Sequence, residues 1–185
     1  GKPALGVGPG NTPAYITKDA KIKRAVNDLF LSKTFDNGMI CASEQAIIVD
    51  NEVYNDVKVE FLAHNAYIVS SKAELAKLQA AVMLPDGHAV NPKIVGFSAK
   101  YIAELAGIKV PEETKLLIAE IAGVGVDFPL SREKLSPVLA MVKANSTEEG
   151  LDLCEAMLDL GGLGHTAVIH TEDEDLQIQF GIRMK

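Results

Sequence analysis

The sequence predicts an α/β fold in which helices flank a mostly parallel sheet. Short apolar runs such as 45–49 and 115–120 have the composition of strands that are buried on both faces of a sheet. Segments with apolar residues at helical spacing separate these runs. Strands that alternate with helices indicate parallel pairing, because a parallel connection needs a long crossover. With 185 residues, 48% of them hydrophobic, the chain is long enough for one domain with its own core.

Residues 1–90 contain the first strands and helices of this alternation. The predicted strands are 13–16, 45–49 and 66–69, and the predicted helices are 19–30, 52–62 and 72–83. Thr17 is a candidate N-cap for the first helix. Asn37 and Gly38 form a dipeptide that is typical of turns, so we expect a turn between that helix and the strand 45–49.

The second half of the chain continues the alternation after a connection that contains Pro and Gly. The predicted strands are 115–120, 138–142 and 167–170, and the predicted helices are 99–106, ended by Gly107, and 147–160, ended by Gly161 and Gly162. The last segment is ambiguous. Apolar residues at every second position from 176 to 184 favour a strand, whereas acidic residues at 173–175 and basic residues at 183 and 185 favour a helix.

Charge and composition exclude several function classes. The chain has 18 Lys and Arg against 25 Asp and Glu, a formal charge of −7, so nucleic acid is not an expected partner. Its apolar runs are shorter than the roughly 20 residues of a membrane span, and its amino end does not resemble a signal peptide. The two cysteines are far apart and form neither a metal spacing nor a disulfide framework. We therefore expect a cytoplasmic protein without a metal site.

The two cysteines have different surroundings. Cys154 is at helical spacing with Leu151, Met157 and Leu158, which predicts a core residue. Cys41 lies in a glycine-containing turn shortly before a buried strand. A free cysteine in such a place is either a small buried hydrophobe, which is its commonest role, or a nucleophile whose thiolate is stabilised by backbone N–H groups.

A nucleophilic cysteine usually works with a base, and the chain has four histidines. His64 and His88 lie in polar connections, where a solvated position is expected, and His170 ends a predicted strand. His165 lies in the glycine-rich turn 161–166 between a helix and a strand, where active-site groups of α/β proteins often occur. From the residues alone, His165 is either functional or an ordinary loop histidine.

The glycine-rich segment 6–11 precedes the first predicted strand. A glycine turn in front of a helix can bring backbone N–H groups to a phosphate. The dinucleotide fingerprint fails here, since Asn11 stands where its third glycine would be, Pro9 lacks an N–H, and no full strand precedes the turn. A turn that packs close to another segment is the favoured interpretation.

Four segments carry a family resemblance. They are GVGPGNTP at 6–13, SKTFDNGMICASEQ at 32–45, REKLSPVLAM at 132–141 and GGLGHT at 161–166. In this order they resemble the CoA-acylating aldehyde dehydrogenases, and most closely the aldehyde dehydrogenase half of the bifunctional aldehyde-alcohol dehydrogenases. The resemblance implies that residues 1–185 are the catalytic domain of the aldehyde dehydrogenase fold, truncated at both ends. The NAD-binding domain and the iron-dependent alcohol dehydrogenase half would lie outside this chain.

The resemblance also implies a reaction and its residues. Cys41 would attack a small aldehyde, expected to be acetaldehyde. The hemithioacetal would pass hydride to NAD, and the thioester would acylate CoA in a reversible, fermentative reaction. His165 matches a histidine that assists the cysteine or the CoA thiol. Glu133 matches a glutamate that holds the nicotinamide ribose. Gly8 and Gly10 belong to the expected cofactor-binding turn. Glu44 is left without a role, and the ambiguous tail matches a helix.

Hydrolytic aldehyde dehydrogenases carry a water-activating glutamate in the turn that corresponds to 6–8. Gly6, Val7 and Gly8 offer no carboxylate, which favours transfer of the acyl group to CoA over hydrolysis. The alternatives are a hydrolytic NAD-dependent relative and a non-catalytic assembly fragment. We expect the isolated chain to be inactive and to hold neither NAD nor CoA, and the parent protein to form a homo-oligomer or filament.

Overall fold

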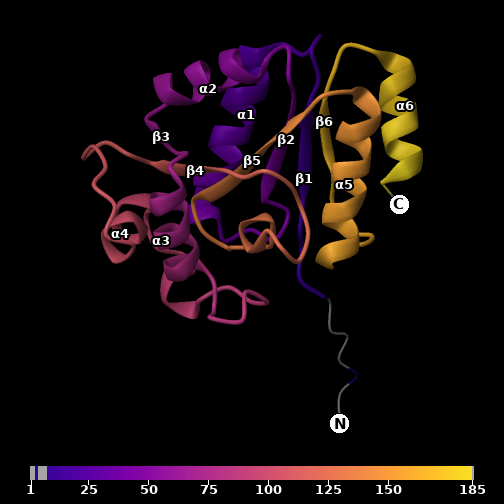
Figure 1. The fold of residues 1–185 in the computed structure, drawn as a ribbon. Helices are drawn as coiled ribbons and strands as arrows, with labels where there is room; N and C mark the ends of the chain where they lie inside the picture. The colour runs from indigo at the N-terminus through magenta and orange to yellow at the C-terminus, as the bar shows by residue number, and fades with distance from the viewer. Residues whose placement is uncertain (1–2, 4–7, 185) are drawn as a thin grey trace.

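A parallel sheet with helices on both faces forms the centre of the molecule (Figure 1). The computed structural model describes Pro3 and residues 8–184. In this part of the chain the sheet has six strands in the order β3-β4-β5-β2-β1-β6, and each pairing between neighbours is parallel. The strands are β1 (Pro13–Ile16), β2 (Ala46–Asp50), β3 (Ala66–Val69), β4 (Leu116–Glu120), β5 (Val138–Ala144) and β6 (Val168–His170). The predicted fold class is confirmed.

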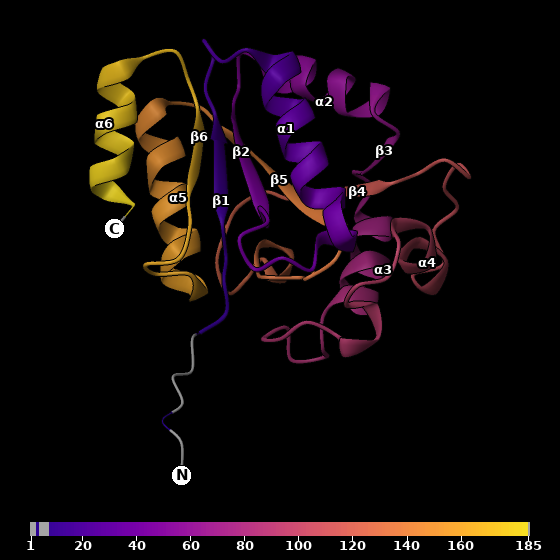
Figure 2. The same cartoon turned by 180° about the vertical axis from the view of Figure 1, so that it is seen from behind.

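The helices pack in pairs on the two faces of the sheet. They are α1 (Ile22–Thr34), α2 (Tyr54–Ala63), α3 (Lys72–Val82), α4 (Ala99–Leu105), α5 (Thr147–Gly161) and α6 (Glu174–Arg183). Short 3₁₀ helices at η1 (Phe35–Gly38), η2 (Pro92–Ile94) and η3 (Pro129–Ser131) were not predicted. Figure 2 shows α5 and α6 beside β1 and β6, and α3 and α4 below β3 and β4.

Alternating residues of the strands divide the core into separate clusters. Ile47 and Val49 of β2 face α1 and α2, whereas Ile48 between them faces α5. Leu117 and Ala119 of β4 lie in a further cluster with α3 and α4. Both faces of the sheet are therefore covered, which explains why its strands are continuous apolar runs.

The prediction of Thr17 as an N-cap is wrong. Helix α1 begins at Ile22, and Lys21 at the cap position makes no side-chain cap bond. The Thr17 hydroxyl instead bonds to Asp19 and donates to the carbonyl of His170, 3.0 Å away. Thr17 thus joins the ends of β1 and β6, and the chain turns once more before α1 starts.

The ambiguous tail is a helix, as the resemblance implied. Asp173 caps α6 by accepting a hydrogen bond from the Leu176 N–H at 3.1 Å. Leu176 and Phe180 are buried, whereas Ile178 and Ile182 are 62% and 57% exposed. The buried positions are four residues apart, so helical packing overrides the alternation that suggested a strand.

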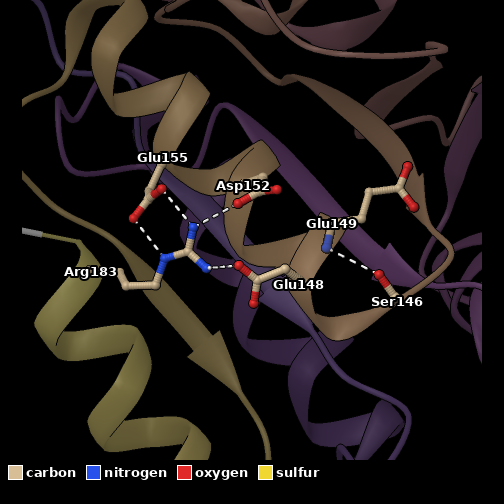
Figure 3. Close-up of polar contacts among 6 residues, drawn as sticks. All are labelled: Ser146, Glu148, Glu149, Asp152, Glu155 and Arg183. Carbon is tan, nitrogen blue, oxygen red and sulfur yellow. Dashed lines mark hydrogen bonds and ion pairs between the residues drawn. The ribbon is translucent and has the colours of Figure 1, made fainter.

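Arg183 fastens the end of α6 to α5 (Figure 3). Its guanidinium contacts three carboxylates of α5: Glu155 at 2.7 Å, Asp152 at 2.7 Å and Glu148 at 3.0 Å. At the start of α5, the Ser146 hydroxyl accepts a hydrogen bond from the Glu149 N–H at 3.2 Å. The basic end of α6 therefore meets the acidic face of its neighbour.

Among the described residues, no helix has both the length and the apolar composition that crossing a membrane requires.

Candidate active site

The predicted site residues all precede strands of the sheet. Gly8 and Gly10 come before β1, Cys41 before β2, Glu133 before β5 and His165 before β6. These strands are consecutive in the sheet order, and because they are parallel their amino ends share one edge. That edge lies at the bottom of Figure 1, where the chain enters β1. Ligands of open α/β sheets usually bind outside the carboxyl ends, so this site occupies the opposite edge.

Gly10 lies where three of the predicted residues meet. A Cβ placed on Gly10 would lie 2.6 Å from the Cys41 carbonyl oxygen, 3.3 Å from His165 Nε2 and 3.4 Å from Glu133 Oε1. The Gly10 N–H donates a hydrogen bond to Glu133 Oε1 at 3.2 Å. The structure thus brings the backbone carbonyl of Cys41, the Glu133 carboxylate and the His165 ring together around one residue that has no side chain.

Gly8 differs from Gly10. No described atom lies within 4 Å of a Cβ placed on Gly8, so its cofactor-binding role stays a prediction. Gly6 and Val7, where the missing carboxylate was noted, lie outside the described residues.

The turn that carries Cys41 follows a strained segment. Asp36, Asn37 and Gly38 have positive φ angles of 47°, 50° and 70°, which reverse the chain after α1. The Asn37 amide then donates to the Gly96 carbonyl at 2.9 Å. Cys41 itself is exposed. Its interpretation as a buried hydrophobe is therefore wrong.

Cys154 has the opposite environment. It is completely buried on α5, and burial raises the pKa of its thiol. Its predicted place in the core is confirmed, and a thiol of this kind is inert.

His165 and Glu133 both place a polar side-chain atom close to Gly10. The turn of His165 needs small residues, because a Cβ on Gly162 would lie 2.8 Å from the Asn11 nitrogen. His165 Nδ1 lies 2.9 Å from the Thr166 hydroxyl, which leaves Nε2 directed at Gly10. Burial raises the pKa of Glu133, and the hydrogen bond from Gly10 and the nearby His165 counteract the rise.

A cavity of about 190 Å³ adjoins Glu133. Its wall includes Gly10, Arg132 and His88. His88 is exposed, as expected, but no pattern in the sequence predicts that the connection between α3 and η2 returns to this edge of the sheet. Groups of three or more His, Cys, Asp or Glu side chains that are placed to bind a metal do not occur in the described part of the chain.

Sequence reasoning missed two lysines behind the site. Lys33 and Lys134 are both 0% exposed. Lys134 Nζ donates to the carbonyls of Gln45, Leu130 and Arg132 at 2.7–2.8 Å. Lys33 Nζ donates to Gln45 Oε1 at 3.1 Å. The two lysines belong to the segments 32–45 and 132–141 that carry the family resemblance, but a lysine in a sequence normally indicates surface.

Burial also changes the protonation of these lysines. It lowers the pKa of Lys33 to about 7, against an opposing effect of Glu44 and Glu133. Burial and the nearby Lys33 together lower the pKa of Lys134 well below its ordinary value. Glu44, which had no assigned role, is buried and accepts a hydrogen bond from the Ser32 hydroxyl at 2.7 Å. It serves as a nearby counter-charge for Lys33.

The lowered pKa of Lys33 predicts an unusual dependence of stability on pH. Between pH 7 and about 10, the unfolded chain keeps a proton on Lys33 that the folded chain has released, so stability rises with pH. We expect the wild type to gain up to about 1.4 kcal/mol of unfolding free energy per pH unit in this window, relative to Lys33→Met. Urea unfolding at several pH values measures this change. A difference that stays constant with pH would show that folding does not lower the pKa of Lys33.

The comparisons with known proteins support the fold. No protein-family model matches the chain. Aldehyde-alcohol dehydrogenase from Streptococcus pneumoniae is 48% identical over 191 residues, covering 100% of this chain and 22% of that protein. The crystal structure of an acetylating aldehyde dehydrogenase from Geobacillus thermoglucosidasius has a TM-score of 0.92 at 46% identity, covering 98% of this chain and 40% of that chain.

A solved structure with lower sequence identity contains a bound ligand. Rhodopseudomonas palustris propionaldehyde dehydrogenase, solved with bound CoA and an acylated cysteine, has a TM-score of 0.89 at 26% identity and covers 100% of this chain and 41% of that chain. The chain thus spans about a fifth of the length of the S. pneumoniae relative. Over its whole length the chain is similar to one segment of the aldehyde-alcohol dehydrogenases and the acetylating aldehyde dehydrogenases.

Proposed function

We propose that this chain is the cysteine-bearing catalytic segment of an NAD-dependent, CoA-acylating aldehyde dehydrogenase. The convergence of Cys41, Glu133 and His165 around Gly10 is the observation that carries the proposal. The acylated cysteine in the R. palustris relative supports a covalent route in this group of proteins. Acetaldehyde is the proposed substrate, because the G. thermoglucosidasius relative is described as acetylating.

The exposed thiol of Cys41 suits nucleophilic attack. Its sulfur would form a bond to the aldehyde carbon while the carbonyl oxygen takes up a proton, giving a hemithioacetal. His165 Nε2 lies near Gly10, as the Cys41 backbone carbonyl does, and would hold or pass the thiol proton. A nicotinamide cofactor, when bound, would accept hydride from the carbon of the hemithioacetal, and loss of the hydroxyl proton to a base or to solvent would leave the thioester.

Glu133 fits the sugar of such a cofactor. Its carboxylate is partly buried beside a cavity and receives the Gly10 N–H on one oxygen, so acceptor capacity is left for hydroxyl groups. The thiol of CoA would then attack the thioester, release acyl-CoA and return the sulfur of Cys41. The reaction oxidises the aldehyde by two electrons and is reversible in principle.

The proposal places the nucleotide-binding domain outside this chain, because the chain spans only part of its relatives. A cytoplasmic and fermentative role, assembly into a homo-oligomer or filament, and any iron-dependent alcohol dehydrogenase half rest on the resemblance alone. The isolated chain would be inactive.

The acyl acceptor gives the sharpest test. The full-length protein is supplied with acetaldehyde and NAD, with and without CoA, while NADH is followed by absorbance and the products by chromatography. We expect NADH formation to require CoA and acetyl-CoA to accumulate. NADH formed equally well without CoA, with acetate as product, would indicate the hydrolytic alternative. The isolated chain, which should give no NADH, is the control.

A further inference from the structure

Lys134 is held by the backbone on both sides of the site. Its Nζ is fully buried and bonds to three carbonyl oxygens, of Gln45, Leu130 and Arg132. A buried lysine costs stability unless its donors are satisfied, and here carbonyls satisfy them without a paired carboxylate. The first of these carbonyls belongs to the segment 32–45 that carries Cys41. The other two belong to residues that come shortly before Glu133 in the chain.

The side chain of Gln45 makes the complementary connection. Its Oε1 accepts from the Lys134 N–H at 3.0 Å and from Lys33 Nζ at 3.1 Å. Its Nε2 donates to the Ser43 carbonyl at 2.9 Å. The Ser43 N–H in turn donates to the Ile40 carbonyl at 2.9 Å, which closes the turn around Cys41. One amide side chain thus joins the turn of the nucleophile to the residue that follows Glu133.

These bonds act where the sheet itself provides few. The register of β2 with β5 begins at Ala46 and Ala140, after the turn of Cys41 and the loop of Glu133. Among the hydrogen bonds of the described residues, the strand pairing adds only one between the segment of Cys41 and that of Glu133. It runs from the Ala140 N–H to the Gln45 carbonyl, at 3.1 Å. The side chains of Lys134 and Gln45 therefore extend the pairing of β2 and β5 beyond the strand ends.

We propose that Lys134 and Gln45 are positioning residues, which set the distance between the nucleophile Cys41 and the cofactor-binding Glu133. This inference rests on the proposed function. Hydride transfer needs the carbon bound to Cys41 and the nicotinamide held through Glu133 to be in register. An error of about 1 Å in such a geometry can lower the rate by roughly 10²-fold.

Lys134→Met in the full-length protein tests the proposal, because methionine keeps much of the side-chain length and removes the donors. Three readouts are combined: kcat/KM for NAD, the primary isotope effect with deuterated acetaldehyde, and the rate at which iodoacetamide alkylates Cys41. We expect kcat/KM for NAD to fall by about 10- to 100-fold, the isotope effect to rise and Cys41 alkylation to stay within about twofold.

Gln45→Glu is the second variant, in case Lys134→Met does not fold. The carboxylate keeps an acceptor for Lys134 and Lys33 and loses the donor to Ser43, so the same pattern with a smaller loss is expected. Lys115→Met, at an exposed lysine before β4, is the matched control and should behave as the wild type.

The outcomes separate the inference from the proposed function. If the wild type forms no acyl-CoA, the proposed function fails. If the wild type is active and a folded variant keeps the wild-type kcat/KM and isotope effect, the inference alone fails. A variant in which Cys41 alkylation falls as much as activity, or in which Cys154 also becomes reactive, indicates general disruption and overturns the positioning role as well.

Discussion

Replacing Cys41 by alanine removes acyl-CoA formation by the full-length protein, with an expected loss of roughly 10⁴-fold or more, as is typical when a covalent nucleophile is deleted. The buried Cys154 cannot replace it, because its thiol is inaccessible and its pKa is raised. Coupled assays of NADH and acetyl-CoA measure the loss.

Cys154→Ala is the matched control for this substitution. It removes the other thiol from the core of α5, so some stability is expected to be lost while acyl-CoA formation continues. Undiminished turnover in Cys41→Ala, or complete loss in a folded Cys154→Ala protein, would contradict the assignment of the nucleophile.

Gly10→Ala is expected to have the second largest effect. Its methyl group would lie 2.6 Å from the Cys41 carbonyl oxygen, a backbone atom that cannot move without the whole turn. It would also press on His165 and Glu133. We expect kcat/KM for NAD to fall by about 10²-fold, since a small displacement in a reacting geometry has this effect. The unfolding free energy should fall by about 1–3 kcal/mol.

Gly181→Ala provides the comparison on α6. No described atom lies within 4 Å of a Cβ at Gly181, which lies inside an exposed helical stretch. Alanine there should leave activity unchanged and raise stability by up to about 1 kcal/mol, because it is the better helix former. If Gly10→Ala behaves in the same way, Gly10 is not the crowded centre that the structure describes.

Most strands and helices could be predicted from the sequence, because a strand and a helix each bury apolar residues that recur with a different period. Strands such as β3 (Ala66–Val69) agree with the prediction residue by residue. The wrong N-cap and the ambiguous tail both lie where contacts between distant segments decide the structure. Thr17 bonds to His170, and α6 takes its direction from packing on α5. Neither partner can be inferred from local sequence.

In the site, too, some residues could be predicted from the sequence and others could not. Cys41, His165 and Glu133 were identified from motif resemblance, and the parallel sheet then explains why they meet. The location at the amino edge follows from the predicted order, because each site residue precedes a predicted parallel strand, although the general rule for α/β sheets gives the other edge. Lys134 and Gln45 were missed since their bonds join residues 89 positions apart and their residue types suggest exposure.

The contacts of Arg183 with the carboxylates of α5 affect the order in which parts of the molecule unfold. Helix α6 buries only Leu176 and Phe180 among its described residues and is too short to be stable in isolation. Its carboxylate partners on α5 are 38–69% exposed, so dissolved ions weaken these contacts. The amide hydrogens of α6 should therefore exchange with solvent before those of the central strands, and sooner as ionic strength increases. The last helix is thus a local unfolding unit whose opening free energy depends on salt.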